Sequence, residues 1–322
     1  ESRGARYLPL YLRRLLVLLL FGLIHATVLW AGDILVIYAV TGLVLVLFRN
    51  ASPRALRVWI AISLALPVLW VGAMTGIYNL TRLIVPGAEG LEARATQRQR
   101  LEAEMALETY NEGSFVERFA QRVSDLKLSY AGLAINGWFL NGLALFLMGL
   151  YVGKSGILQD VQAHLGAIRR ARWWGLGLGL TGASMTLWGD LAANPIRPTF
   201  ATLVEMAGHA VGDPALAVFY GASLVLLVQD ERWQKRLAPL AAAGRLALTN
   251  YLAQSLIVTT VLTGFGLFGK VGPAAGLIMT VVIYAAQLVF SQWWTARFRF
   301  GPAEWLWRTL QYGKRQPMRL PG

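Results

Sequence analysis

The chain has no cysteine among its 322 residues, and only 15% of its residues are charged. The missing thiols exclude disulfide scaffolds, thiolate zinc sites, iron–sulfur clusters and cysteine nucleophiles. Soluble domains are about 25% charged, whereas this chain is 56% hydrophobic, with a mean hydropathy of +0.50. That much apolar surface does not fit inside one water-soluble core, so we expect lipid to solvate most of it.

The familiar short motifs of catalysis and nucleotide binding are also missing. The sequence contains no GxxxxGK[ST] loop, no HExxH, no GxSxG and no dinucleotide fingerprint. Its three histidines, His25, His164 and His209, are too scattered to predict a metal site. Glu205 lies one helical turn before His209, but two residues alone are a weak signal. The residues by themselves therefore assign no metal and no cofactor.

Long apolar runs are what the chain does have. A run of about 17–25 apolar residues is the length that crosses a bilayer as a helix. We identify about eight such runs, at 12–30, 33–48, 57–78, 133–152, 173–190, 201–228, 246–264 and 274–295. The fold class predicted over 1–322 is an all-α, polytopic transmembrane helical bundle that forms a single integral membrane domain.

The sixth run is interrupted by Gly212-Asp213-Pro214. Proline lacks the N–H that continues a helical hydrogen-bond ladder. Two interpretations stay open: an interfacial helix up to Val211 followed by a short span from Ala215, or one kinked helix.

The basic residues predict an orientation. If the N-terminus is cytoplasmic and the spans alternate, most of the 30 lysines and arginines fall in the inner segments. The positive-inside rule then places both ends in the cytoplasm, with an even number of spans. We therefore expect the basic residues behind the formal charge of +13 to face anionic lipid headgroups. Each juxtamembrane basic residue contributes about 1 kcal/mol to this attraction. We expect the lipid bilayer to be the partner and no nucleic acid to bind, since no recognition motif is present.

Two segments outside the runs have their own character. The stretch 80–131 predicts an extracytoplasmic helical loop, with a charged helix over 91–110 and a break at Asn111-Glu112-Gly113. Ser114 and Glu117 have the spacing of a capping box, and they precede a helix with one apolar stripe. That stripe consists of Phe115, Phe119, Val123 and Leu126. The loop either lies on the membrane or bundle mouth as a lid, or has no function of its own.

The tail, 297–322, predicts a cytoplasmic interfacial helix. Pro302 suits a helix start, and the following tryptophans and arginines are typical of membrane-surface anchors. We interpret this helix as an anchor.

His25 and Asp33 are ionisable groups placed where lipid makes them costly. His25 lies 11 residues beyond Arg14, or ~16 Å along a helix, and Asp33 follows a tight turn. The two could pair as a general-base dyad, in which the aspartate fixes the imidazole tautomer. Alternatively, Asp33 caps the second helix while His25 donates to a backbone carbonyl, and this is the interpretation we prefer.

A second polar cluster begins beside Arg245. Asn250 and Gln254 share one helix face, and Tyr251 and Ser255 share the neighbouring one. Such side chains usually join membrane helices by hydrogen bonds worth about 0.6–2 kcal/mol each, although an anionic ligand would enter at this end. The paired glycines Gly72/Gly76, Gly149/Gly153 and Gly175/Gly179 further predict close helix packing.

Several stretches together resemble a known family. They are FGLIH at 21–25, WAGDIL at 30–35, GRLALTNYLAQS at 244–255 and FRFGPAEWLWR at 298–308. Over nearly its whole length the chain resembles the YeiB-type family of bacterial inner-membrane proteins, a domain of unknown function. The resemblance implies a multi-pass protein of the bacterial cytoplasmic (inner) membrane. Family members normally carry further N-terminal spans, so we expect this chain to lack about two of them.

That family is distantly similar to the membrane acyltransferase superfamily, which moves an acyl group from cytoplasmic acyl-CoA to an acceptor across the membrane. The likeness implies acyl-CoA as the donor and a small-molecule or glycan acceptor. It implies His25 and Asp33 as catalytic residues. The implied substrate-binding residues are Arg13, Arg14, Arg245, Asn250, Tyr251 and Gln254. A transporter or lipid-handling protein, and a membrane protein without catalysis, are the alternatives. The sequence assigns no oligomeric state.

Overall fold

The helices of the chain are resolved in a computed structural model, which describes residues 7–85, 87–135, 137–194 and 197–320. These residues are all-α, with one isolated bridge between Phe298 and Arg319 as their only β pairing. They form two compact units, Glu1–Leu43 with Glu102–Ser129 and Arg232–Gly322, and Val44–Leu101 with Tyr130–Glu231. The proposal of a single integral membrane domain stays a prediction.

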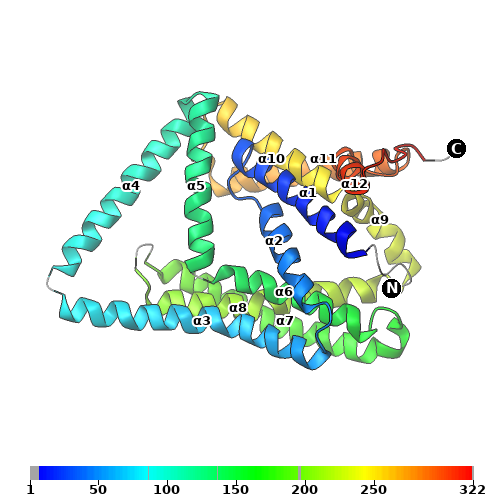
Figure 1. The fold of residues 1–322 in the computed structure, drawn as a ribbon, viewed down its shortest axis with the longest axis horizontal. Helices are drawn as coiled ribbons and strands as arrows, with labels where there is room; N and C mark the ends of the chain where they lie inside the picture. Colours follow the sequence, from blue (N-terminus) through cyan, green and yellow to red (C-terminus); the bar gives the residue numbers. More distant parts are fainter. Residues whose placement is uncertain (1–6, 86, 136, 195–196, 321–322) are drawn as a thin grey trace. The chain divides into compact units, whose positions relative to one another are not determined.

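The first unit contains the N-terminal and C-terminal helices (Figure 1). Its helices are α1 (Tyr7–Val28), the start of α2 (Leu35–Leu45), α9 (Glu231–Arg245), α10 (Ala247–Gly264), α11 (Pro273–Thr295) and α12 (Pro302–Tyr312). The second unit contains η2 (Val46–Phe48), α3 (Pro53–Ile84), α6 (Trp138–Ser155), α7 (Val161–Ala192) and α8 (Phe200–Leu227). Both units share α4 (Ala88–Glu112) and α5 (Phe115–Ile135).

Every predicted apolar run coincides with most of an observed helix. Among the described residues, four helices are long and apolar enough to cross a membrane: α1, α3, α8 and α11. The pair α9 and α10, bent by 72° at its break, would make a fifth. The protein is therefore an all-α chain with four or five helices able to span a membrane.

The sixth run is one helix. α8 continues through Gly212, Asp213 and Pro214 to Leu227, so the interpretation as two separate segments is wrong. The reason lies in its packing against α7. A Cβ at Gly182 of α7 would lie 2.4 Å from the Cα of Gly212, so the two backbones touch where proline weakens the ladder.

Glycines make this close approach possible, as predicted for Gly175 and Gly179. A Cβ at Gly175 would lie 2.7 Å from the carbonyl oxygen of Ala215, and one at Gly179 would meet Leu216. The pair Gly149/Gly153 differs, because no described atom lies within 4 Å of a Cβ at either position. The glycine pair on α7 therefore marks a close contact with α8, whereas the pair on α6 marks no such contact among the described residues.

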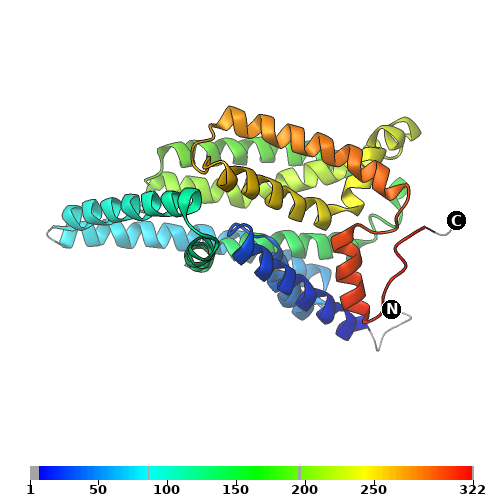
Figure 2. The same ribbon diagram turned by 90° about the horizontal axis from the view of Figure 1, so that it is seen from above.

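The capping box is confirmed. The Ser114 N–H donates to Glu117 Oε2 over 2.7 Å, and the Glu117 N–H donates to Ser114 Oγ over 3.3 Å. Because the carboxylate accepts from Ser114, the pKa of Glu117 is lowered from its usual range. α12 likewise begins at Pro302 as predicted, and it packs across α1 with the Arg14 guanidinium 4.6 Å from the centre of the Trp307 ring (Figure 2).

Candidate functional site

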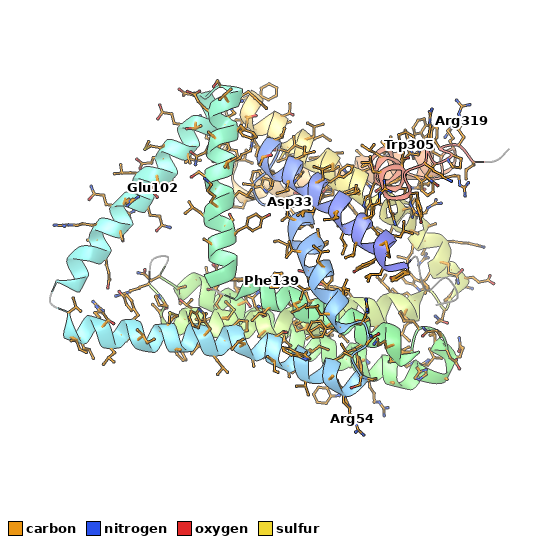
Figure 3. All side chains as sticks on the ribbon, viewed as in Figure 1. Asp33, Arg54, Glu102, Phe139, Trp305 and Arg319 are labelled. Atoms are coloured by element: carbon orange, nitrogen blue, oxygen red, sulfur yellow. The ribbon has the colours of Figure 1, made fainter. Side chains whose placement is uncertain are left out.

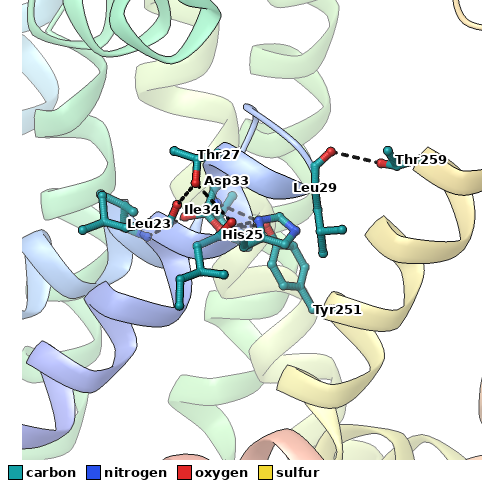
Figure 4. Close-up of polar contacts among 10 residues, drawn as sticks. Leu23, His25, Thr27, Leu29, Asp33, Ile34, Tyr251 and Thr259 are labelled. Atoms are coloured by element: carbon teal, nitrogen blue, oxygen red, sulfur yellow. Dashed lines mark hydrogen bonds and ion pairs between the residues drawn. The ribbon is translucent and has the colours of Figure 1, made fainter. Parts of the chain in front are cut away.

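The turn between α1 and α2 brings His25 and Asp33 together. The His25 carbonyl accepts from the N–H groups of Leu29 and Trp30, which closes the end of α1. Glycine at position 22 lets α2 start close by, since a Cβ there would lie 2.7 Å from the Val36 nitrogen. The Thr259 hydroxyl then donates to the Leu29 carbonyl, fastening the turn to α10 (Figure 4).

The pairing and capping interpretations of Asp33 hold at the same time. Asp33 Oδ1 lies 2.8 Å from His25 Nδ1, and Asp33 Oδ2 accepts from the Val36 N–H over 2.7 Å. The two side chains are 1% and 0% exposed. Our expectation that His25 would instead donate to a backbone carbonyl is wrong, because Nδ1 faces the Asp33 carboxylate and neither ring nitrogen bonds to a described carbonyl.

Tyr251 completes this group from α10. Its hydroxyl donates to Asp33 Oδ1 over 3.3 Å and accepts from the Ile34 N–H over 3.2 Å. The centres of the Tyr251 and His25 rings are 4.8 Å apart. Tyr251 therefore holds the aspartate in place, and this contact spans more than 200 residues of sequence. We call His25, Asp33 and the partly buried Tyr251 the buried triad, after its two buried members.

One member of the triad, His25, lines a largely apolar cavity of about 490 Å³. His25 is its only ionisable lining residue, and the remaining wall comes mainly from α1, α10 and α12, including Phe21, Leu252, Leu256 and Leu306. A cavity of this size is in the range of small-molecule sites. Neither ring nitrogen of His25 has a hydrogen-bond partner among the described residues. Because Nδ1 faces the Asp33 carboxylate at ion-pair distance, Nε2 is the ring nitrogen left for a ligand.

Asn250 and Gln254 lie on the same helix but join α10 to α11. Asn250 Nδ2 donates to Ser291 Oγ over 3.1 Å, and Gln254 Nε2 donates to Gln287 Oε1 over 2.6 Å. Gln287 in turn donates to the Asn250 carbonyl over 2.8 Å. These amides satisfy one another inside the helix pair, as expected for residues that join membrane helices.

The three predicted arginines lie apart from the triad. Arg13, Arg14 and Arg245 are exposed, and Arg14 stacks on Trp307 of α12. The turn that carries Asp33 and the α12 helix that carries Trp305 lie at different ends of α1 (Figure 3).

Glu304 is a buried residue that the sequence did not single out. It is 8% exposed, and its carboxylate accepts from the Thr249 N–H (3.0 Å) and hydroxyl (2.5 Å). Thr249 also lines the apolar cavity, so this contact fixes α12 as a wall. The sequence did contain a signal for Glu304, because it is an acidic residue in the first turn of a helix that begins with proline.

A second histidine–aspartate pair lies in the second unit. His209 Nδ1 is 3.0 Å from Asp213 Oδ2, one turn along α8, and the two side chains are 20% and 47% exposed. Asp190 and Glu205 lie on the same open pocket of about 320 Å³. His209 thus pairs with the residue four positions after it, while Glu205, one turn before it, lines the same pocket.

Comparison with known proteins gives relatives over nearly the full chain. The chain is 36% identical to the uncharacterised protein YxaH of Bacillus subtilis, over 99% of this chain and 75% of YxaH. It is 28% identical to the uncharacterised protein YeiB of Escherichia coli, over 96% of this chain and 76% of YeiB. An uncharacterised 39.9 kDa protein of Bacillus acidopullulyticus is 26% identical, with 99% and 76% coverage. No solved structure matches the chain.

The model of one protein family, described as a protein of unknown function (DUF418), matches residues 152–314. This stretch includes Tyr251 and runs from the end of α6 to the end of α12, whereas the relatives above also cover His25 and Asp33. The resemblance to the YeiB-type family is confirmed, and the chain belongs to the DUF418 family.

Proposed function

We propose that this DUF418 protein resides in the bacterial inner membrane and transfers an acyl group from cytoplasmic acyl-CoA to an extracytoplasmic acceptor. The observation that carries the proposal is the buried His25–Asp33 pair, whose histidine lines a largely apolar cavity. Ionisable groups are costly in such surroundings, and where they occur they usually serve a function. The proposal includes about eight spans with both ends cytoplasmic.

His25 acts as the general base in this mechanism. Asp33 holds Nδ1, which leaves Nε2 to take the proton from an acceptor hydroxyl or amine. The acceptor oxygen or nitrogen then forms its bond to the acyl carbon, and the thioester C–S bond breaks. The coenzyme A thiolate leaves and takes up the proton from the imidazolium. Asp33 stabilises the positive imidazolium between these steps.

The apolar cavity takes the acyl group. Its wall runs from His25 to Pro302, Leu306 and Leu310 of α12, which carries Trp307 beside Arg14. With α12 on the cytoplasmic side, an acyl chain that enters along this wall reaches the buried triad. The exposed Arg13, Arg14 and Arg245 then meet the phosphates of coenzyme A.

Thiol release tests the proposal. The purified protein in nanodiscs is incubated with acetyl-CoA or a longer acyl-CoA and a panel of hydroxyl and amino acceptors. Because the chain contains no cysteine, a thiol reagent reports coenzyme A release without background. We expect His25→Gln to slow acceptor-dependent release about 100-fold or more.

His209→Gln is the matched control, since it removes a histidine that also pairs with an aspartate. We expect it to change the rate less than about 3-fold. Equal rates for wild type and His25→Gln would overturn the assignment of the base.

Lipid handling without chemistry is the second candidate, and the apolar lining of the cavity favours it. It predicts that the protein retains a fluorescent fatty-acyl probe and releases no thiol. It also predicts equal retention by wild type and His25→Gln, because apolar contacts alone would hold the probe.

A further inference from the structure

A second cavity lies under the tip of the α4–α5 hairpin, entirely within the first unit. It holds about 360 Å³. Its wall combines the turn at 29–32 with side chains of α4, α5, α10 and the loop that follows α10. Nothing in the acyl-transfer mechanism uses the residues of α4 and α5 that line it, which include Tyr110, Arg122 and Asp125.

Arg122 is the unusual member of this wall. It is 4% exposed, and it makes no hydrogen bond or ion pair with any residue that the structure describes. The face of the Tyr110 ring is its nearest charge-compatible contact, with 5.8 Å between the guanidinium carbon and the ring centre. Burial lowers the pKa of Arg122 from its usual value, but a guanidinium stays charged in proteins.

Asp125 attracts this charge electrostatically but forms no hydrogen bond with it. Its Oδ2 accepts from the Tyr110 hydroxyl over 2.5 Å, and its Oδ1 accepts from Gln121 Nε2 over 2.8 Å. Burial and the hydrogen bond to Asp125 raise the pKa of Tyr110, so the phenol stays a proton donor at neutral pH. Both carboxylate oxygens therefore accept from neutral donors, whereas the guanidinium of Arg122 donates to no residue that the structure describes. Buried charges of this kind are usually paired.

The opposite part of the wall is flat and apolar. Phe268 stacks on Tyr110 with ring centres 4.5 Å apart, and it lies 6.0 Å from Trp30. Asn111 fixes this arrangement, because its side chain both donates to the Phe268 carbonyl (3.1 Å) and accepts from the Phe268 N–H (2.9 Å). The cavity is thus preformed, with one unsatisfied cation and an aromatic surface.

We propose that this cavity binds an organic anion, whose carboxylate or phosphate group bonds to Arg122 while a flat apolar body packs against Trp30 and Phe268. A guanidinium recognises either oxyanion with paired, charge-assisted hydrogen bonds. The oxyanion can belong to a soluble metabolite or to a lipid headgroup. The inference does not rest on acyl transfer, since His25 has no part in it.

Direct binding tests the proposal. Benzoate and phenyl phosphate are titrated calorimetrically into the protein in nanodiscs of phosphatidylcholine alone, with benzyl alcohol as the neutral probe. We expect both anions to bind at about millimolar concentration or tighter and benzyl alcohol to bind at least about 10-fold more weakly.

Arg122→Gln should weaken anion binding about 10-fold or more, because it removes the charge and the paired donors. Lys127→Gln is the matched control, since Lys127 is an exposed cation on the same helix. We expect it to change the affinity less than about 2-fold. Arg122→Lys keeps the charge and reports whether the site still folds, because it should bind with intermediate affinity.

A second arm identifies the source of the oxyanion. If a lipid headgroup occupies the site, nanodiscs with phosphatidylglycerol compete with phenyl phosphate in wild type. If the ligand is soluble, the affinity for phenyl phosphate is the same in both kinds of disc. Either result supports an anion site. Failure of both anions to bind in phosphatidylcholine discs, or equal binding by wild type and Arg122→Gln, overturns the proposal. Neither outcome bears on thiol release by His25.

Discussion

The two histidine–aspartate pairs of this protein have nearly the same contact and opposite surroundings. In the first unit, His25 and Asp33 lie 2.8 Å apart with side chains 1% and 0% exposed. In the second unit, His209 and Asp213 lie 3.0 Å apart with side chains 20% and 47% exposed. The distance alone does not distinguish them, whereas the burial does, because no water competes for the polar atoms of a buried pair.

The two pairs also arise differently. His209 and Asp213 are four residues apart on α8, where helix geometry alone makes side chains neighbours. His25 and Asp33 need a turn, a glycine at the helix contact and a tyrosine from α10. The more elaborate support belongs to the pair for which we propose chemistry.

The largest difference that we expect between the two pairs is in their contribution to the free energy of unfolding. Asp33→Ala removes a buried partner of His25 and the acceptor for the Val36 N–H, so we expect a loss of about 3–5 kcal/mol. Asp213→Ala, at a half-exposed site, should lose less than about 1 kcal/mol. Reversible unfolding in mixed micelles measures both. Similar losses would show that burial does not separate the pairs.

The next difference concerns activity. Asp33→Asn keeps the shape but no longer stabilises an imidazolium, so we expect acceptor-dependent thiol release to fall about 100-fold, or about 2.7 kcal/mol. Asp213→Asn should leave release within about 3-fold of wild type. A loss of activity in Asp213→Asn alone would transfer the catalytic proposal to the second unit.

The helix contact that carries the second pair can be tested separately. Gly182→Ala forces a methyl group against the backbone at Gly212, so we expect a loss of about 2 kcal/mol. Gly149→Ala, on α6 with no described atom within 4 Å of its Cβ, is the control and should change stability by less than about 0.5 kcal/mol. Thermal unfolding monitored by circular dichroism compares them. Equal stability of the two variants would contradict the close contact of α7 and α8.

The smallest effect is expected at Tyr251, a positioning residue of the buried triad. Tyr251→Phe removes the bonds to Asp33 and to the Ile34 N–H, and we expect a loss of about 1 kcal/mol in stability. It should also slow thiol release about 5-fold and shift the pH profile of the rate, because Asp33 loses a donor. An unchanged pH profile would reduce Tyr251 to a packing residue.

Features with local causes could be predicted from the sequence. The capping box of Ser114 and Glu117, the end of α4 before Gly113 and the start of α12 at Pro302 each depend on neighbouring residues. The apolar runs likewise predicted the helices, since lipid and core both select long hydrophobic segments.

Features that depend on distant segments were missed or predicted incorrectly. α8 continues through Pro214 because α7 packs against it, and local rules contain no information on that neighbour. On α5 the burial of Arg122 was missed, because its side chain is 4% exposed although arginine usually lies at the surface. The hairpin partner and the loop at Phe268 decide which face of α5 is buried.

The sequence by itself determined that this protein is all-α and apolar enough for a membrane, because composition and the spacing of apolar residues can be read along the chain. Its motifs likewise identified it as a member of a recognisable family. Tertiary structure alone decided that Asp33 serves as both cap and partner of His25, that Tyr251 holds it, and that Arg122 is buried without a hydrogen-bond acceptor among the described residues. Those outcomes depend on contacts between residues up to 218 positions apart, which no local pattern records.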